Sequence, residues 1–211
     1  MHRVSVFDAF AFGIRAFRAD PLSYAARIGV IVAFLLIVVS LIGDSLSAMG
    51  LQSGIGMLIV ASAGAVAQLA YTRLALTALR ERVAAWDELW LPRAFPSIIV
   101  YAVFQSVLFS APSPLLLTLA FILAVLLAFV PFLVVERGST LIDAARESIR
   151  LVAPRAGTVA LLLIASAFLN LAGLIALGVG VLVSLPITLI ATAHVYQSIV
   201  HEERSSTKPH A

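Results

Sequence analysis

Six apolar segments, separated by short polar stretches, account for most of the chain. A helix needs about 20 apolar residues to cross a bilayer core of about 30 Å, and each segment comes close to that length. The segments are Tyr24 to Gly43, Ile55 to Tyr71, Ser97 to Ala111, Leu115 to Val135, Thr158 to Ala176 and Val179 to Ser198. The pattern predicts an all-α fold, an integral membrane bundle of six transmembrane helices.

The basic residues all lie at one end of these segments. None of the fourteen Lys and Arg residues is found in the turns near Asp44, Pro112 and Leu177, and all of them fall in or beside the other polar stretches. By the positive-inside rule, short loops rich in Lys and Arg stay in the cytoplasm. We therefore expect three hairpins in the cytoplasmic (inner) membrane of a bacterium, with the N- and C-termini both cytoplasmic.

The composition indicates one membrane domain, residues 1–204, followed by a flexible cytoplasmic tail, residues 205–211. Hydrophobic residues make up 62% of the chain and charged residues 12%. That is about half the charged fraction of a soluble protein, roughly 25%. The basic residues are interleaved with acids beside the apolar segments, so the expected partner is the anionic head groups of membrane lipids, not nucleic acid.

Each hairpin is preceded by a segment that opens with an apolar residue and Asp, namely Phe7-Asp8, Trp86-Asp87 and Ile142-Asp143. At helical periodicity, charged residues gather on one side of such a segment and apolar residues on the other. We expect three short amphipathic helices lying on the cytoplasmic leaflet. The residues expected to contact lipid or a protein partner there are Phe7, Phe10, Arg15, Arg18, Trp86, Trp90, Arg146 and Arg150.

Helix-start signals accompany two of these segments. Asp20 followed by Pro21 predicts the N-cap and the first residue of the first membrane helix. Thr140, three residues before Asp143, predicts the start of the third amphipathic helix. The expected apolar faces are Phe7, Phe10, Ile14 and Phe17 in the first amphipathic helix and Leu141, Ala145, Ile149 and Val152 in the third.

Few polar side chains, and no acidic ones, lie well inside the apolar segments. The candidates for a cavity near the middle of the membrane are Gln68, Gln105, Asn170 and His194. Such side chains more often hydrogen-bond between helices than contact a substrate. Pro131 and Pro186 each remove a backbone hydrogen bond, which predicts a kink and marks both as candidate hinges.

The chain contains no sequence motif typical of an enzyme or of a metal site. It has no glycine-rich phosphate loop, no paired carboxylates in a cleft and no Ser, His and Asp set. It also has no Cys, which excludes Cys-ligated metals and disulfides. His194 and His201 would lie about 10 Å apart along a helix, too far to share one metal. We expect no enzymatic activity, no cofactor and no metal, although a haem or pigment ligand at His194 alone stays open.

A resemblance covers about the last third of the chain. The run from Pro131 to Ser139, followed by Asp143-Ala144 and Ser148-Ile149-Arg150, resembles a pattern of uncharacterised bacterial and archaeal polytopic membrane proteins. The series Asn170, Gly173, Gly178, Gly180, Pro186 and Tyr196 continues it. The named relative is the membrane domain that accompanies some glycerophosphodiester phosphodiesterases. The resemblance implies a helical accessory or anchoring module and carries over no catalytic residue.

Three interpretations of function follow. The first is a non-enzymatic accessory, scaffold or lipid-interacting protein of the inner membrane. Any protein partner is expected at its cytoplasmic face. The second is a small-molecule transport subunit with a midplane cavity around Gln68, Gln105 and Asn170. The third is a small subunit of a larger membrane complex, suggested by the size of the chain and by His194.

Overall fold

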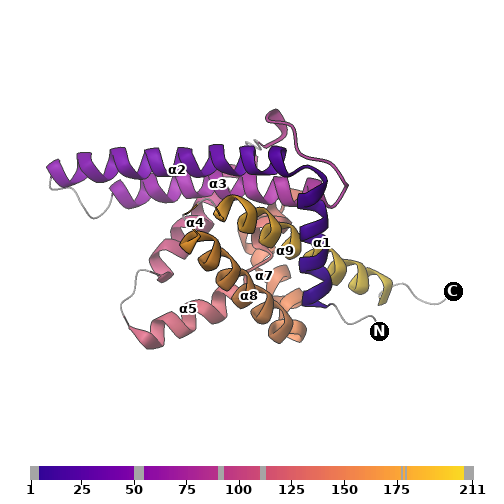
Figure 1. Ribbon diagram of the computed structural model, residues 1–211. Coiled ribbons are helices and arrows are strands. Elements are labelled where there is room, and N and C mark those ends of the chain that lie inside the picture. Colours follow the sequence, from indigo (N-terminus) through magenta and orange to yellow (C-terminus); the bar gives the residue numbers. More distant parts are fainter. Residues whose placement is uncertain are drawn as a thin grey trace.

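The computed structural model describes residues 5–49, 55–89, 93–109, 113–176, 178 and 180–206, and all regular structure within these ranges is helical (Figure 1). The helices are α1 (Val6–Ala19), α2 (Pro21–Met49), α3 (Ile55–Ala78), η1 (Asp87–Leu89), α4 (Phe95–Phe109), α5 (Pro114–Leu126), α6 (Val130–Arg137), α7 (Leu141–Val152), η2 (Ala153–Arg155), α8 (Ala156–Ile175) and α9 (Val181–Ser206). The predicted all-α fold is confirmed. α9 passes the expected domain boundary at residue 204, and residues 207–211 lie outside the described ranges.

Five helical stretches of the described chain are long and apolar enough to cross a membrane. They are Pro21–Leu41, Ile59–Ala78, Pro114–Arg137, Leu141–Ile175 and Val181–Ser205. The sixth expected span, α4, is shorter, with an apolar part that covers Phe95–Val107. The count of six spans in three hairpins therefore stays a prediction, and the turns expected near Pro112 and Leu177 lie outside the described residues.

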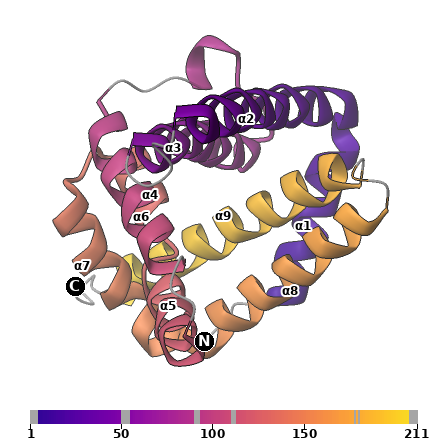
Figure 2. The same ribbon diagram turned by 90° about the vertical axis from the view of Figure 1, so that its left-hand side faces the viewer.

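The helices do not run as one parallel set. α2 and α3 pack side by side, and the α8–α9 pair is inclined to them in both views (Figures 1 and 2). α9 crosses the middle of the assembly, where α1, α2, α3 and α8 all contact it (Figure 2). This central position makes α9 the most buried of the five long apolar stretches.

α1 packs across α9 through small residues. Ala9 and Gly13 are the buried residues of α1. A Cβ atom on Gly13 would lie 2.5 Å from the carbonyl oxygen of Ile187, a distance that real contacts do not reach, so this crossing requires glycine. Ile187 directly follows Pro186, which lies inside the continuous helix α9. The candidate hinge at Pro186 is therefore the place where α1 contacts α9.

The other candidate hinge, Pro131, stands beside a complete break in the expected span from Leu115 to Val135. α5 ends at Leu126, and α6 begins at Val130 with Pro131 in its first turn. Proline is tolerated at that position because the N–H group that it lacks would have no partner within the helix. The kink predicted from Pro131 is thus a division of one apolar stretch into two helices.

Side chains from two other helices bind the backbone groups at this break. The Ser148 hydroxyl of α7 donates to the carbonyl oxygen of Leu126 at 2.8 Å and accepts from the N–H group of Phe129 at 3.3 Å. The Tyr101 hydroxyl of α4 donates to the carbonyl oxygen of Leu127 at 3.0 Å. In an apolar surrounding, backbone groups that lack an intrahelical partner must find one within the protein. These two side chains allow the chain to break between α5 and α6.

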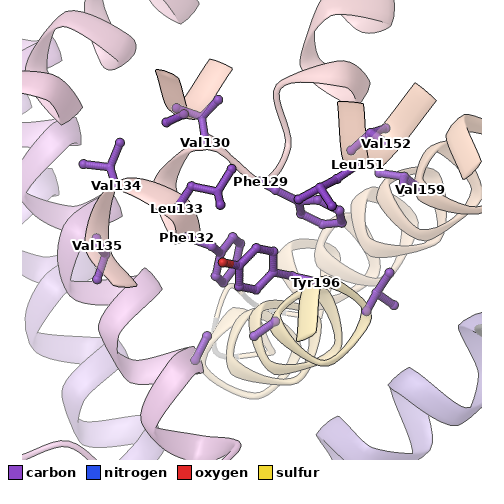
Figure 3. Packing of buried hydrophobic residues seen from close by; sticks show 14 of the residues in the cluster. Phe129, Val130, Phe132, Leu133, Val134, Val135, Leu151, Val152, Val159 and Tyr196 are labelled. Atoms are coloured by element: carbon purple, nitrogen blue, oxygen red, sulfur yellow. The ribbon is translucent and has the colours of Figure 1, made fainter. Parts of the chain in front are cut away.

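The largest buried cluster surrounds Tyr196 of α9 (Figure 3). The Tyr196 ring stacks on Phe132 with centroids 5.3 Å apart and meets the Phe129 ring edge-on at 5.4 Å. Its hydroxyl donates to a carboxylate oxygen of Glu136 at 2.5 Å. α6 and the chain just before it are therefore held on α9 by aromatic packing and by a hydrogen bond.

Ion pairs add to these contacts near the end of α9. Arg150 of α7 pairs with Glu203 at 3.3 Å, and Arg155 of η2 pairs with Glu202 at 2.8 Å. The side chains of these pairs are partly exposed, so each pair contributes little to stability on its own. Their position matters more, because they join the C-terminal turns of α9 to the segment that links α7 with α8.

Candidate functional site

The buried face of α1 differs from the apolar stripe that its sequence predicts. Ala9 and Gly13 form the buried face, whereas Phe10 and Phe17 are only partly buried beside it. Phe7 is 85% exposed. The reason is the close crossing with α9, which accepts small residues and leaves the larger side chains at its edges or on the outside.

The outward face of α1 combines apolar and basic side chains. Phe7 and Ile14 lie two helical turns apart on this face, and Ile14 is 38% exposed. Arg15 and Arg18 are exposed on the same side of the helix. A helix of this kind meets the requirements of a membrane interface, where apolar side chains enter the acyl region and basic groups meet phosphates.

α7 divides its residues in a similar way. Ala144, Ser148 and Leu151 are buried against the protein, and so is Val152, which the sequence places on the apolar face. Ile149, which the sequence places on the apolar face, is 41% exposed, because the buried arc is shifted toward Ala144 and Ser148. The exposed side of α7 holds Ile142, Arg146, Ile149 and Arg150.

The second expected amphipathic helix is replaced by the single 3₁₀ turn η1. A Glu88 carboxylate oxygen accepts from the Ala85 N–H group at 3.3 Å, a bond of the kind that caps the start of a helical turn. Trp86 is 48% exposed, and the Arg27 guanidinium lies 5.4 Å from the centre of its ring, within cation–π range. Trp90 lies outside the described residues.

A cavity of about 790 Å³ lies between α1, the start of α2 and the end of α3. Its volume is within the range of pockets for small ligands, about 300 to 1,000 Å³. The charged residues that line it are Arg15, Asp20, Arg27, Glu81 and Arg82. Arg15, Glu81 and Arg82 are exposed, so the cavity is open to the surface. Its lining therefore offers both signs of charge to a molecule that enters from outside.

The end of α3 brings two of these charges into place. The uninterrupted pattern after Tyr71 predicts a helix that continues through Arg80, but α3 ends at Ala78. The N–H groups of Arg80 and Arg82 both bond to the carbonyl oxygen of Thr77, and Glu81 adopts a left-handed φ of 55°. This tight turn places Glu81 and Arg82 in the wall of the cavity.

Two of the three arginines in the cavity are already bound within the protein. Arg27 donates from Nε to the carbonyl oxygen of Ala84 at 2.8 Å and from Nη1 to that of Ser23 at 3.0 Å. Arg82 forms an ion pair with Glu88 at 2.7 Å. The bond from Arg27 to Ala84 attaches the 83–89 loop to α2, and the other two contacts hold the guanidinium groups of Arg27 and Arg82.

The remaining charges have free binding capacity. Among the described residues, Arg15 and Glu81 have neither a hydrogen-bond nor an ion-pair partner. Asp20 accepts from the Ser23 N–H group at 3.2 Å, which confirms the predicted N-cap of α2 before Pro21. Hydrogen bonds from the Ser23 side chain and main chain lower the pKa of Asp20, so its carboxylate stays ionised near neutral pH.

The four polar residues expected around a midplane cavity belong to four different helices, and three of them make separate contacts. Gln68, Gln105, Asn170 and His194 lie on α3, α4, α8 and α9. Gln105 donates to the Tyr101 hydroxyl on its own helix, at 3.2 Å. Asn170 donates to the Thr188 hydroxyl of α9, also at 3.2 Å. The His194 ring packs on Phe12, with centroids 4.8 Å apart. No hydrogen bond among the described residues joins two of the four, and none of them lines the cavity above.

Sequence reasoning placed Arg15 on a lipid surface and Asp20 at a helix start, but it did not group either with Glu81. The cavity depends on how α1 crosses the end of the α2–α3 pair, and the residues that join there are far apart in the chain. The sequence holds only a weak signal for this grouping, namely the adjacent acid and base Glu81 and Arg82 in the polar stretch after the second apolar segment.

Five helical stretches of the described residues have the length and composition to cross a membrane, and they define the class: this is a membrane protein built from several apolar helices. Neither family models nor curated proteins nor solved structures match the chain. The resemblance to the membrane domain of glycerophosphodiester phosphodiesterases therefore stays a prediction. Among the described residues, no group of three or more His, Asp or Glu side chains is arranged to hold a metal ion.

Proposed function

We propose that this chain is a non-enzymatic protein of the bacterial inner membrane that acts as an accessory or scaffold component and contacts anionic lipid at its cytoplasmic face. The observation that carries the proposal is the outward face of α1, where Phe7, Ile14, Arg15 and Arg18 are exposed together. The proposal includes six spans with cytoplasmic termini, which the one-sided distribution of basic residues supports.

The attachment of α1 to α9 gives this face a fixed orientation. Because Gly13 packs against the backbone of α9, α1 cannot rotate without losing that contact. Phe7 and Ile14 are then directed away from the protein, toward the acyl chains of the surrounding lipid. The two arginines beside them gain about 1 kcal/mol each from an anionic membrane surface.

α7 supplies a second contact of the same kind. Ile142 is 64% exposed and stands on the same side of α7 as Arg146 and Ile149. The hydrogen bonds of Ser148 to the α5–α6 break fix the opposite side of α7 to the protein. Two rigidly held amphipathic faces favour a protein that orders the lipid or the proteins around it.

The absence of Cys from the chain permits a clean test with single spin labels. A label at Phe7→Cys should collide with lipid-dissolved oxygen far more than with a water-soluble nickel chelate, after reconstitution in vesicles that contain phosphatidylglycerol. The matched control is Ser205→Cys, an exposed position near the end of α9, which should show the opposite preference.

Charge is tested in the same system. The double variant Arg15→Gln and Arg18→Gln should weaken the dependence of the Phe7 label on phosphatidylglycerol, whereas Arg93→Gln, an exposed arginine before α4, should not. Equal access of water to the labels at positions 7 and 205 would contradict the proposal. Recovery of the detergent-extracted protein as a lone monomer, with neither lipid nor protein bound, would also count against it.

The transport interpretation has less support. The side-chain amide of Gln105 donates to Tyr101 on the same helix, and that of Asn170 donates to Thr188 on a neighbouring helix. These are the roles that polar side chains commonly take in membrane helices.

A further inference from the structure

The cavity between α1, α2 and α3 carries an inference that rests on the proposed lipid-contact function and adds a second, zwitterionic lipid to it. We infer that this cavity binds the headgroup of an amine-bearing phospholipid, with Arg15 on the phosphate and Glu81 on the ammonium group. The shared chemistry is that of phosphoethanolamine, a phosphate ester joined to a primary amine.

The charge of the lining is the first argument. Three arginines and two carboxylates face one cavity, and Arg27 and Arg82 already have partners. Within the described part of the chain, Arg15 is the one cation of this lining without a hydrogen-bond or ion-pair partner, and Glu81 is the one such anion. A phosphate binds well to the planar fork of an arginine, and an ammonium group donates to carboxylate oxygens. A headgroup with both charges satisfies both residues, whereas a purely anionic headgroup leaves Glu81 and Asp20 opposed to it.

The location of the cavity is the second argument. It lies where the apolar stretch Pro21–Leu41 begins and where the stretch Ile59–Ala78 ends, that is, at the ends of two candidate membrane spans. The ends of membrane helices lie at the depth of lipid headgroups. A phospholipid beside the protein therefore presents its headgroup at this level without being lifted out of the bilayer.

The surface of α2 continues the site toward the membrane. Ser23 and Arg27 line the cavity, and Val30 and Phe34 follow them at the spacing of one helix face. Val30 is 54% exposed and Phe34 is 43% exposed. An acyl chain attached to a headgroup in the cavity can lie along this apolar continuation, which a free phosphoethanolamine cannot use.

Native mass spectrometry of the full-length protein tests the inference directly. The protein is extracted in a mild detergent and titrated separately with phosphatidylethanolamine, phosphatidylcholine and phosphatidylglycerol that carry the same acyl chains. We expect one molecule of phosphatidylethanolamine to be retained under activation that removes the other two. Equal retention of the three lipids would overturn the inference, and so would displacement of the bound lipid by free phosphoethanolamine at comparable concentration.

Matched variants separate the cavity from the surface of α1. Arg15→Gln should weaken retention of phosphatidylethanolamine about tenfold, the loss expected for one charge-assisted hydrogen bond, whereas Arg18→Gln, which is also exposed but lies outside the cavity, should leave it unchanged. Ala19→Trp should block the cavity, and Ala11→Trp on the outward face of α1 should not. Glu81→Gln should reduce the preference for phosphatidylethanolamine over phosphatidylglycerol, with Asp87→Asn as its control.

These results distinguish the two proposals. Equal losses in Arg15→Gln and Arg18→Gln would refute the cavity site and leave the lipid-contact function in place. A water-exposed label at position 7, together with selective retention of phosphatidylethanolamine that depends on Arg15 and Glu81, would support the cavity site and refute the lipid-contact function.

Discussion

α2 and α9 are both apolar and long enough to cross a membrane, yet they have opposite surroundings. In α2 an 18-residue window of the apolar stretch Pro21–Leu41 is 17% buried, whereas the corresponding window of Val181–Ser205 in α9 is 61% buried. α9 is also the less apolar of the two and carries Thr188, Thr192 and His194. Apolar composition alone therefore does not decide which helix lies in the interior of the protein. A helix that faces lipid has only to be apolar, whereas an interior helix needs small residues and hydrogen-bonding groups at particular positions.

The largest expected effect of this difference lies at Tyr196 in α9. Tyr196→Ala removes a fully buried ring that packs on Phe129 and Phe132, and it should lower the free energy of unfolding by about 3 to 5 kcal/mol. The α2 counterpart Leu36→Ala, at a position 65% exposed, should change it by less than about 0.5 kcal/mol. Unfolding in mixed SDS micelles, followed by circular dichroism, measures both. Similar losses in the two variants would break the distinction between α2 and α9.

Glycine substitutions test the contact that α9 makes with α1. Gly13→Ala places a methyl group against the Ile187 carbonyl oxygen and should cost about 1 to 3 kcal/mol, because α1 must move away from α9. Gly157→Ala in α8 meets no atom within 4 Å and should be neutral or stabilising by up to about 1 kcal/mol. The same unfolding assay applies. A neutral Gly13→Ala would mean that the crossing of α1 and α9 is not close-packed.

Two threonines offer a finer comparison of interior and lipid-facing positions. Thr188 in α9 donates to the Leu185 carbonyl oxygen of its own helix, as Thr118 in α5 does to that of Pro114. Only Thr188 also accepts a hydrogen bond from Asn170. Thr188→Val should therefore cost about 0.6 kcal/mol, the average for hydrogen bonds between membrane helices, and Thr118→Val should cost less. Equal costs would show that the bond from Asn170 contributes nothing.

An effect of similar size, but dependent on salt, is expected where α9 leaves the apolar region. Arg155→Gln removes the ion pair with Glu202 and should cost about 0.2 to 1 kcal/mol, because both side chains are only about two-thirds buried. The cost should decrease at high salt, which screens exposed charges. Arg93→Gln, at an exposed position, is the control. A loss in Arg155→Gln that is independent of salt would indicate packing of the arginine stem and not its charge.

Local signals allowed several helix starts to be predicted from the sequence. The N-cap at Asp20 is confirmed, and so is the one at Thr140, whose hydroxyl accepts from the Asp143 N–H group at 3.3 Å. Each depends on residues within three positions of one another. The apolar segments were also predictable, because their length and composition alone define them.

Features that depend on distant contacts were not predictable. The break before α6 requires Tyr101 and Ser148, and neither residue type signals such a role in the sequence. The buried face of α1 is set by the close approach of Gly13 to α9 at Ile187, a contact that the pattern of the first amphipathic segment does not indicate. The α1–α2–α3 cavity has the same origin, since its lining comes from two segments that meet only after folding.

The partners of the α5–α6 break also impose an order on the synthesis of the protein. When the ribosome has completed α6, Tyr101 has already been made and is able to bind the Leu127 carbonyl group. Ser148 comes 22 residues after Leu126, so the bond to that carbonyl group cannot form until α7 has emerged. The Leu126 carbonyl group and the Phe129 N–H group therefore lack these bonds while α5 and α6 are made, and both gain their partner only when α7 folds back.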